Sequence, residues 1–475
     1  MRSKIISTVI FSFVFSTLVF AEQTAKPIQE LTPILKAAQQ MEPMPELPKG
    51  PLLLTSTTSE QLTADYWVKR LKNADQVLKT PNELKKFNEE IDDQLPEVMD
   101  VFKIKGMFRG TDVQSNIQEA YDTVANRKLF DVRNKVVPKS FFENEVKPFL
   151  NLENIPKMVK IRWGTAIKAT SVRALPTYVK VLEEVGDVEF DQLQFTLIKL
   201  WTPVAIYQES SDGRWYFIQA PYVRGWVESK DVAIFKNQDE LKKYAKSKSF
   251  LDVTGESVRV CSDISCKNMI ERPTMGTVIP RAGKLENNYV VYMPKRGENG
   301  NVILKKAFIN RHADVLEHFP PYTQANFIRQ AFKLLGVRYG WGGMYNGRDC
   351  SGFTHDVFLS MGVAMPRDSK QQPFVGTQLG HFEPYQDRDK KIAALDVATE
   401  GISLLRMPHH IMLYIGSVDG KYFVIHSTWA ERIGQDKIKD EKRRINQVVV
   451  SDLSLNGKSY LGDLFERVIG INEVN

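Results

Sequence analysis

The spacing of apolar residues changes character along this chain, and the changes limit the folds open to it. Residues 63–130 place apolar side chains at helical spacing, whereas residues 160–235 alternate apolar and polar side chains between turn signals. A second alternating stretch covers residues 252–312, and beyond residue 320 helix and strand patterns alternate. With 475 residues the chain can fill several separate cores. We therefore expect a multidomain α+β protein with a helical region, two small barrels and a C-terminal α+β domain.

The first residues carry the pattern of an export signal. Arg2 and Lys4 precede an apolar run that extends to Phe20, and small residues at Val19 and Ala21 suit a signal peptidase. We expect cleavage after Ala21, export, and no integral membrane segment in the mature chain. An uncleaved membrane anchor is the alternative, but the run is short for a bilayer span and carries a cleavage pattern. No cysteine stands directly after the apolar run, which disfavours a lipoprotein anchor.

The charge of the chain restricts its partners. Removing Arg2 and Lys4 from 64 basic and 57 acidic residues leaves a net charge of +5. Such a small, dispersed excess suits a cell-wall polymer or a membrane surface better than nucleic acid. The sequence also lacks zinc-finger spacing and RNA-binding aromatic motifs, so we expect no nucleic-acid partner.

Proline and turn signals divide the chain further. Six prolines from Pro27 to Pro51 disfavour helix and central strand, which indicates a linker. Thr80, Pro81 and Glu83 form a capping-box signature for a helix that starts at Pro81. The predicted parts are a signal peptide (1–21), a Pro-rich linker (22–60), a mainly helical domain (61–150), a first barrel (151–240), a second barrel (241–319) and a C-terminal α+β domain (320–475).

Two of the three cysteines lie close together in the second barrel. Cys261 and Cys266 could form a disulfide in an oxidising compartment, or could remain two reduced thiols. Either state leaves Cys350 without a partner, and a leftover cysteine in an exported protein needs an explanation. No second Cys or His pair completes a zinc site around Cys261 and Cys266.

Cys350 lies where a helical pattern begins, after the glycine-rich stretch 339–349. Unpaired backbone N–H groups make a helix N-terminus electropositive, so we expect a lowered thiol pKa, as a cysteine nucleophile requires. The alternative is that Cys350 acts only as a small buried hydrophobic residue, as isolated cysteines commonly do.

A cysteine nucleophile needs a histidine base, and the strand pattern selects one. If Tyr414 pairs with Tyr422 across a hairpin, His410 lies directly opposite His426 on one face. His410 would then be the base, and His426 would orient it. A zinc site built from His409, His410, His426 and Cys350 is disfavoured, because adjacent strand residues face opposite ways. His355, at i+5 on the helix of Cys350, points away from it.

At these residues the sequence resembles the NlpC-type cell-wall peptidases, which are papain-like cysteine enzymes. RYGWGGMYNGRDCSGF (338–353) is similar to the nucleophile region, and HIMLYIG (410–416) to the histidine strand. FVIHSTW (423–429) resembles the strand of the third catalytic residue, and MPRDSKQQ (365–372) resembles a segment found in one subgroup. That subgroup has a helical N-terminal domain and two bacterial SH3-like barrels, so the resemblance implies these folds here.

The resemblance implies roles for individual residues. Cys350, His410 and His426 match the catalytic positions, and Tyr339 matches a tyrosine that supports the tetrahedral intermediate. Asp349 and Ser351 match positions that bind the free amine of an N-terminal L-Ala in related enzymes. Asp349 is equally placed to cap the helix of Cys350, and both roles can coexist.

The subgroup implies a function. Its members are γ-D-glutamyl-L-diamino-acid endopeptidases that cut peptidoglycan stem peptides between D-Glu and meso-diaminopimelate or lysine. The alternatives are an N-acetylmuramoyl-L-alanine amidase and an inactive wall-binding scaffold. We expect a monomeric, periplasmic enzyme without metal or organic cofactor, acting on stem peptides or muropeptides; secretion or association with the cell wall is the alternative location.

Overall fold

A computed structural model describes residues 50–475 of the chain. The predicted signal peptide and most of the predicted linker lie outside these residues. The described chain forms two compact units, one with residues 99–247 and 293–305, the other with residues 50–98, 248–292 and 306–475. No helix within residues 50–475 is both long and apolar enough to span a membrane.

The first unit begins with a helical part. Its elements are β1 (Met107–Arg109), α4 (Gly110–Ala125), the short α5 (Lys139–Phe141) and β2 (Met158–Lys160). β1 and β2 pair antiparallel, and α4 buries Val113, Ile117 and Tyr121.

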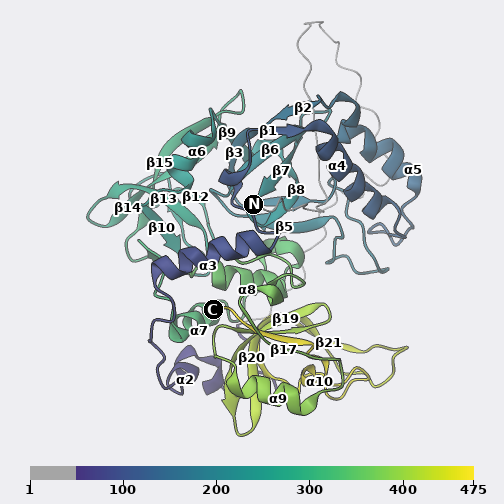
Figure 1. Cartoon of the computed structure of the whole chain (residues 1–475), viewed down its shortest axis with the longest axis vertical. Coiled ribbons are helices and arrows are strands. Elements are labelled where there is room, and N and C mark those ends of the chain that lie inside the picture. The colour runs from purple at the N-terminus through teal and green to yellow at the C-terminus, as the bar shows by residue number, and fades with distance from the viewer. Residues whose placement is uncertain (1–49) are drawn as a thin grey trace, which may run out of the picture. The chain divides into compact units, whose positions relative to one another are not determined.

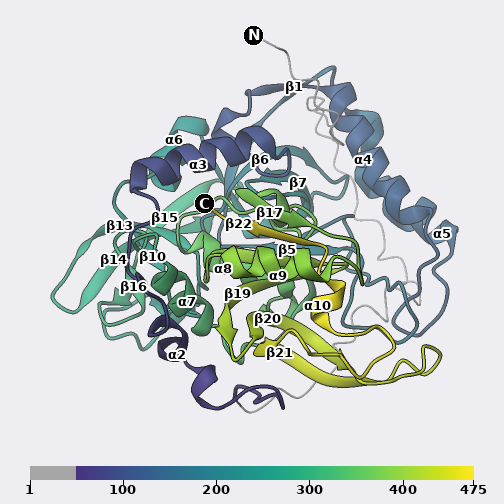
Figure 2. The same cartoon turned by 60° about the horizontal axis from the view of Figure 1, so that its bottom comes forward.

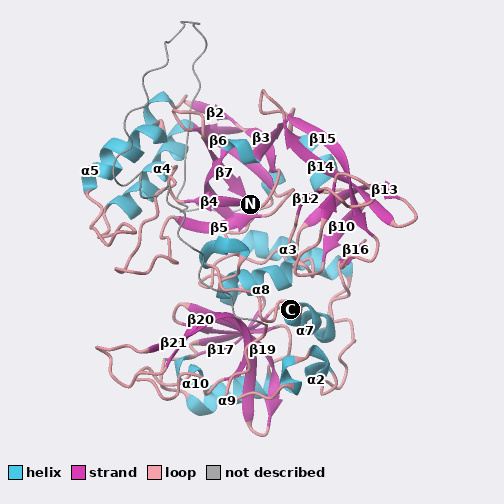
Figure 3. Cartoon of the chain, turned by 180° about the vertical axis from the view of Figure 1, so that it is seen from behind, coloured by secondary structure: helices cyan, strands magenta, loops and turns pink. Residues whose placement is uncertain are grey.

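An antiparallel seven-stranded sheet completes the first unit, with strand order β5-β4-β8-β7-β6-β3-β9 (Figure 3). Residues 211–213 lie in the turn that joins the paired strands β6 and β7. Residues 225–227 lie in β8, and β9 follows as the last strand of this sheet in the sequence. The bounds are β3 (Arg162–Ala166), β4 (Thr170–Arg173), β5 (Gln194–Ile198), β6 (Pro203–Glu209), β7 (Trp215–Ala220), β8 (Val223–Glu228), β9 (Val232–Phe235) and the following α6 (Gln238–Ala245).

A second seven-stranded sheet has the order β12-β11-β15-β14-β13-β10-β16. Most of it lies in the second unit, whereas residues 293–305 of its β14–β15 hairpin belong to the first unit. The bounds are β10 (Phe250–Val253), β11 (Val260–Cys261), β12 (Met269–Glu271), β13 (Val278–Lys284), β14 (Asn288–Arg296), β15 (Val302–Asn310) and β16 (Val315–Leu316).

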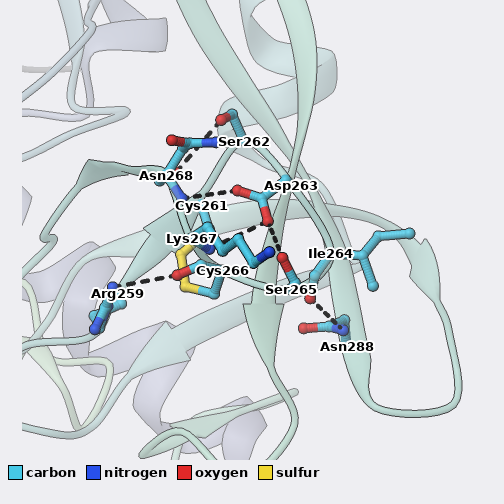
Figure 4. Close-up of a disulfide and its surroundings, with 10 residues drawn as sticks. All are labelled: Arg259, Cys261, Ser262, Asp263, Ile264, Ser265, Cys266, Lys267, Asn268 and Asn288. Atoms are coloured by element: carbon cyan, nitrogen blue, oxygen red, sulfur yellow. Dashed lines mark hydrogen bonds between the residues drawn. A yellow bond between two sulfur atoms is a disulfide. The ribbon is translucent and has the colours of Figure 1, made fainter.

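A disulfide joins Cys261 to Cys266 across the loop between β11 and β12 (Figure 4). Their Cα atoms are 5.0 Å apart. Inside the loop, the Asp263 carboxylate accepts hydrogen bonds from Ser265 Oγ (2.6 Å) and from the backbone N–H of Asn268 (2.8 Å). These bonds lower the pKa of Asp263 to about 2. The disulfide and one carboxylate together fix the loop.

The C-terminal part of the second unit is a six-stranded antiparallel sheet, ordered β17-β22-β18-β19-β20-β21 (Figure 1). Helices α7 (Gln324–Phe332) and α8 (Cys350–Leu359) cover one face, and α9 (Arg388–Val397) and α10 (Leu464–Arg467) lie on the other. The hairpin of β20 and β21 extends beyond the other strands (Figure 2). The strands are β17 (Thr377–His381), β18 (Ser403–Met407), β19 (His410–Val418), β20 (Lys421–Arg432), β21 (Lys442–Asp452) and β22 (Gly470–Glu473).

The segment before residue 98 packs on this sheet domain. Helix α2 (Ala64–Val68) places Trp67 against Phe423, and α3 (Pro81–Gln94) contributes Phe87 to the same core. The capping box predicted at Thr80 is present. The boundary between the two compact units, at residues 98 and 99, thus lies inside the predicted helical domain (61–150). The α+β multidomain architecture stands, while the exact domain boundaries stay predictions.

Candidate active site

The loop before Cys350 is tightly folded and depends on glycine. A Cβ atom at Gly340 would lie 2.1 Å from Met344 O, and one at Gly347 would lie 2.7 Å from Arg338 O. Gly342 and Gly343 adopt φ values of 54° and 78°, which glycine tolerates best. The glycine-rich stretch therefore allows the backbone to close on itself immediately before α8, the helix that starts at Cys350.

Asp349 caps α8 and anchors that loop. Its Oδ1 accepts the N–H of Gly352 (2.7 Å), and its Oδ2 accepts the N–H of Gly342 (2.8 Å). The predicted helix-capping role is confirmed.

Arg367 pairs with the two residues expected to bind a substrate amine. Its guanidinium donates to Asp349 Oδ2 (2.7 Å) and to Ser351 Oγ (2.9 Å). Burial raises the pKa of Asp349, but Arg367 and the backbone hydrogen bonds outweigh it and hold the pKa below its usual range. An arriving ammonium would meet a carboxylate whose charge is already balanced. Arg367 belongs to the 365–372 motif, but the sequence did not indicate this contact.

Cys350 is the first residue of α8 and is buried. The backbone N–H groups of Ile411 and Ser351 hydrogen-bond its sulfur and favour the thiolate, but burial and the nearby Asp349 carboxylate act more strongly. They raise the pKa of the thiol to about 12. The expected lowering of the thiol pKa by the helix N-terminus is therefore wrong, because desolvation outweighs the helix dipole.

His410 and His426 meet on one face of the sheet. His410 Nε2 lies 2.7 Å from His426 Nδ1. The expected pairing of Tyr414 with Tyr422 is wrong: Tyr414 pairs with Val424, and Tyr422 pairs with Ser417. A β-bulge between Tyr414 and Gly416 changes the register, so the two histidines are diagonal neighbours and not directly opposite.

A third side chain continues this contact. His426 Nε2 lies 3.1 Å from Ser451 Oγ on β21, and both residues are buried. For His410 to accept a proton at Nδ1, its Nε2–H must donate to His426 Nδ1. His426 must then carry its proton on Nε2 and donate it to Ser451. The Ser451 hydroxyl can accept that proton, so the contact is compatible with the tautomer that base catalysis needs. No sequence signal pointed to Ser451.

The histidine pair is uncharged at neutral pH. Burial, followed by the positive charge of Arg467, lowers the pKa of His410 to about 4. Burial and His410 hold the pKa of His426 well below its usual value. A neutral imidazole can accept the thiol proton, which suits a general base.

The other candidates lie apart from this chemistry or stay predictions. His409 is exposed in the turn before β19, and buried His355 contacts Asp356 at 3.4 Å. Within residues 50–475 no cluster of three or more His, Cys, Asp or Glu side chains is arranged to hold a metal. Tyr339 is buried and its N–H donates to Asn446 O (2.9 Å). The support of an intermediate by Tyr339 stays a prediction.

Two parts of the chain match models of known protein families. Residues 336–451 match the model of the NlpC/P60 family, and residues 176–228 match that of an SH3 domain of the SH3b1 type. Two proteins named γ-D-glutamyl-L-lysine dipeptidyl-peptidase, from Bacillus cereus and Bacillus subtilis, are each 29% identical, over 44% and 30% of this chain. The matches span 57% and 42% of those relatives.

One solved structure resembles most of the chain. It is an NlpC/P60 endopeptidase from Photobacterium damselae subsp. piscicida, with a TM-score of 0.70 at 17% identity. The match covers 90% of this chain and 99% of that one. At this identity the likeness concerns the fold alone.

Proposed function

Because residues 336–451 form a domain of the NlpC/P60 family, we propose that this chain is a cysteine endopeptidase of cell-wall peptides. It cuts the bond between the γ-carboxyl of D-Glu and the amine of a diamino acid. The observation that carries the proposal is the 2.7 Å contact between His410 and His426, next to a buried cysteine at a helix start. Ile411, whose N–H bonds the Cys350 sulfur, directly follows His410 in the chain.

The reaction follows from these groups. Since the resting thiol and imidazole are both uncharged, proton transfer from Cys350 to His410 accompanies attack on the γ-glutamyl carbonyl. The tetrahedral oxyanion is held by the N–H of Cys350 and by Tyr339. The amide C–N bond then breaks, and His410 protonates the leaving amine. Water, activated by His410, hydrolyses the thioester and restores the thiol.

The names of the relatives support this bond, since both are called γ-D-glutamyl-L-lysine dipeptidyl-peptidases. Recognition of a free N-terminal L-Ala by Asp349 and Ser351 belongs to the same proposal. Because Arg367 already balances Asp349, the amine would join an existing network and would not neutralise an isolated carboxylate.

Product analysis tests the activity. The purified protein is incubated with L-Ala-γ-D-Glu-diaminopimelate, its N-acetylated form and intact muropeptides, and the products are identified by mass spectrometry. Release of L-Ala-D-Glu from the free peptide alone is expected. Cleavage only of glycan-linked stems would favour the amidase, and binding without cleavage would favour the scaffold.

Variants test the residue roles. Cys350→Ala and His410→Asn should each lower kcat/KM by at least about 1000-fold, because each removes a group on which the covalent step depends. His409→Asn is the matched control, since this exposed neighbour should keep activity. Full activity of Cys350→Ala would refute the mechanism.

We also propose export to the periplasm. The leading residues 2–21 and the disulfide between Cys261 and Cys266 support it. Mass spectrometry of the protein from fractionated cells should find a chain that starts at Glu22 in the periplasmic fraction. A full-length chain in the membrane fraction would contradict the proposal.

A further inference from the structure

Arg467 carries a positive charge that nothing in the described part of the chain balances. It ends α10 and is half-buried. Within residues 50–475 its guanidinium forms neither a salt bridge nor a hydrogen bond. By contrast, the Asp356, Asp349 and Asp440 carboxylates pair with Arg348, Arg367 and Arg432, respectively. A partly desolvated guanidinium without a partner is costly unless a ligand supplies an anion.

The fold brings Arg467 to the end of the sheet where His410 lies. Arg406 on β18 pairs with both Ile411 and Gly470, and the N–H of Ile469 donates to Arg406 O (2.8 Å). The segment that leaves α10 therefore runs beside β18, which lies between it and the start of β19. The charge of Arg467 acts on His410 and contributes to its lowered pKa.

The surroundings of Arg467 suit an anion. Tyr385, Tyr460 and Arg432 are the charged or ionisable groups that act on it. Arg432 is itself paired with Asp440 and lies 3.4 Å from the Tyr460 hydroxyl. Two tyrosine hydroxyls and a free guanidinium can bind a carboxylate with charge-assisted hydrogen bonds.

The positions of the two halves of the substrate during the proposed reaction indicate which substrate carboxylate Arg467 would bind. The D-Glu residue stays on Cys350 as the thioester, whereas the leaving amine takes its proton from His410. Groups of the leaving diamino acid therefore lie on the His410 side, with Arg467. Diaminopimelate carries a carboxylate and an ammonium at its distal end, whereas lysine carries only an ammonium, which Arg467 would repel.

We propose that Arg467 binds the distal carboxylate of diaminopimelate and makes the enzyme prefer diaminopimelate to lysine. The inference rests on the proposed function, since it names the substrate class of the same site.

Tetrapeptides test it, because their fourth residue, D-Ala, blocks the α-carboxylate of the diamino acid. The substrates are L-Ala-γ-D-Glu-X-D-Ala, where X is meso-diaminopimelate, its distal amide, or L-lysine. For the unaltered protein we expect kcat/KM for the acid to exceed that for the amide and the lysine peptide by about 10-fold or more. This comparison requires no variant.

Variants then assign the preference to one side chain. Arg467→Gln should lower kcat/KM for the diaminopimelate peptide about 10- to 100-fold and change the other two by less than about 3-fold. Arg467→Lys should keep part of the preference. Arg388→Gln, which removes an exposed charge stacked on Phe465, should leave it unchanged.

Three results would overturn the inference. They are equal turnover of acid and amide, an equal loss on all three peptides in Arg467→Gln, and a preference for lysine, the residue in the names of the Bacillus relatives. If the unaltered protein cleaves none of the peptides, the proposed function itself fails. The two failures are therefore distinguishable.

Discussion

As the proposed base, the His410 imidazole must be neutral to accept a proton, and the positive charge of Arg467 acts on it. Burial and Arg467 both disfavour its charged form, so its pKa is about 4, below the ordinary value near 6.5. His410 therefore stays neutral in mildly acidic solution, where an exposed histidine would be protonated.

The pH profile of the enzyme should reflect this shift. Protonation of His410 removes the base, so we expect the acid limb of kcat/KM to lie well below pH 6.5. In Arg467→Gln a positive neighbour is lost, the pKa of His410 rises, and the acid limb moves to higher pH. The measurement is initial rate against pH on the lysine peptide for both proteins. An acid limb at pH 6.5 or above in the unaltered protein would contradict the prediction.

Ser451 should matter through the tautomer of His426. Ser451→Ala removes the hydrogen-bond acceptor of His426 Nε2, which is worth about 1 kcal/mol, so kcat should fall about 5-fold with little change in KM. Nitrogen-15 NMR of the histidine rings should show a mixture of His426 tautomers. Ser454→Ala, at a serine that bonds Asp452, is the control. A single unchanged tautomer would show that Ser451 has no positioning role.

At the scale of residues, the sequence predicted Cys350, His410 and His426 because each lies in a local pattern with a chemical meaning. Arg367 and Ser451 reach the site from other segments, and such contacts depend on packing that a pattern does not encode. The sign of the Cys350 pKa shift was wrong for the same reason. The helix start is visible in the sequence, but burial is not.

Among the elements, the β19–β20 hairpin determines whether His410 and His426 lie on the same face of the sheet. Val418 pairs with Lys421 around the turn at Asp419 and Gly420. An unbroken ladder from that pair would set Leu413 opposite His426 and move His426 to the other face from His410. The single bulge before Gly416 restores the common face.

Gly416 should therefore be sensitive to substitution. Its φ of 133° is rarely adopted by other residues, so Gly416→Ala should lower the free energy of unfolding by about 1–2 kcal/mol. Activity should also fall, since the register of His410 depends on the bulge. Gly283→Ala is the control, because Gly283 also follows a bulge but has no positive φ and open space around it. Urea unfolding followed by fluorescence measures the change, and equal effects of both variants would contradict this account.

Sequence patterns predicted both strands of the hairpin but not their register. The alternation of apolar residues marks the strands, whereas a bulge adds one residue without a change in composition. The shared face of His410 and His426 was expected from a pairing of Tyr414 with Tyr422, whereas Tyr414 pairs with Val424, two residues further on. Because side chains alternate between the two faces of a strand, a shift of two residues keeps both histidines on the same face.

At the scale of the whole molecule, the predicted order of helical region, barrels and catalytic domain matches the described elements, but the compact units do not follow that order. Asn88 on α3 donates to Gly362 O (2.8 Å) and accepts from the N–H of Ala364 (2.8 Å). A segment early in the chain thus becomes part of the catalytic unit. Local patterns predict elements and not the distant surface on which they pack.

The disulfide should stabilise the protein without serving catalysis. It closes a short loop in the second sheet, and such a link is worth about 2 kcal/mol. Cys261→Ser with Cys266→Ser should lower the unfolding free energy of the second unit by that amount and keep peptide cleavage. Reducing agent should destabilise the unaltered protein but not the double variant. Loss of cleavage in a folded double variant would assign the disulfide a different role.

The segment before α2 contacts residues that are synthesised much later, which limits when the fold can be completed. The N–H of Leu52 donates to Gln447 Oε1, 395 residues later (3.0 Å), and Leu54 packs in one core with Ile471. A ribosome makes Leu52 long before either partner exists, and closing so large a loop is slow. The sheet itself cannot be completed before β22, the strand of Ile471, has been made. The proposed wall-cutting activity should therefore arise only after residues 470–473 have been made and have paired with β18.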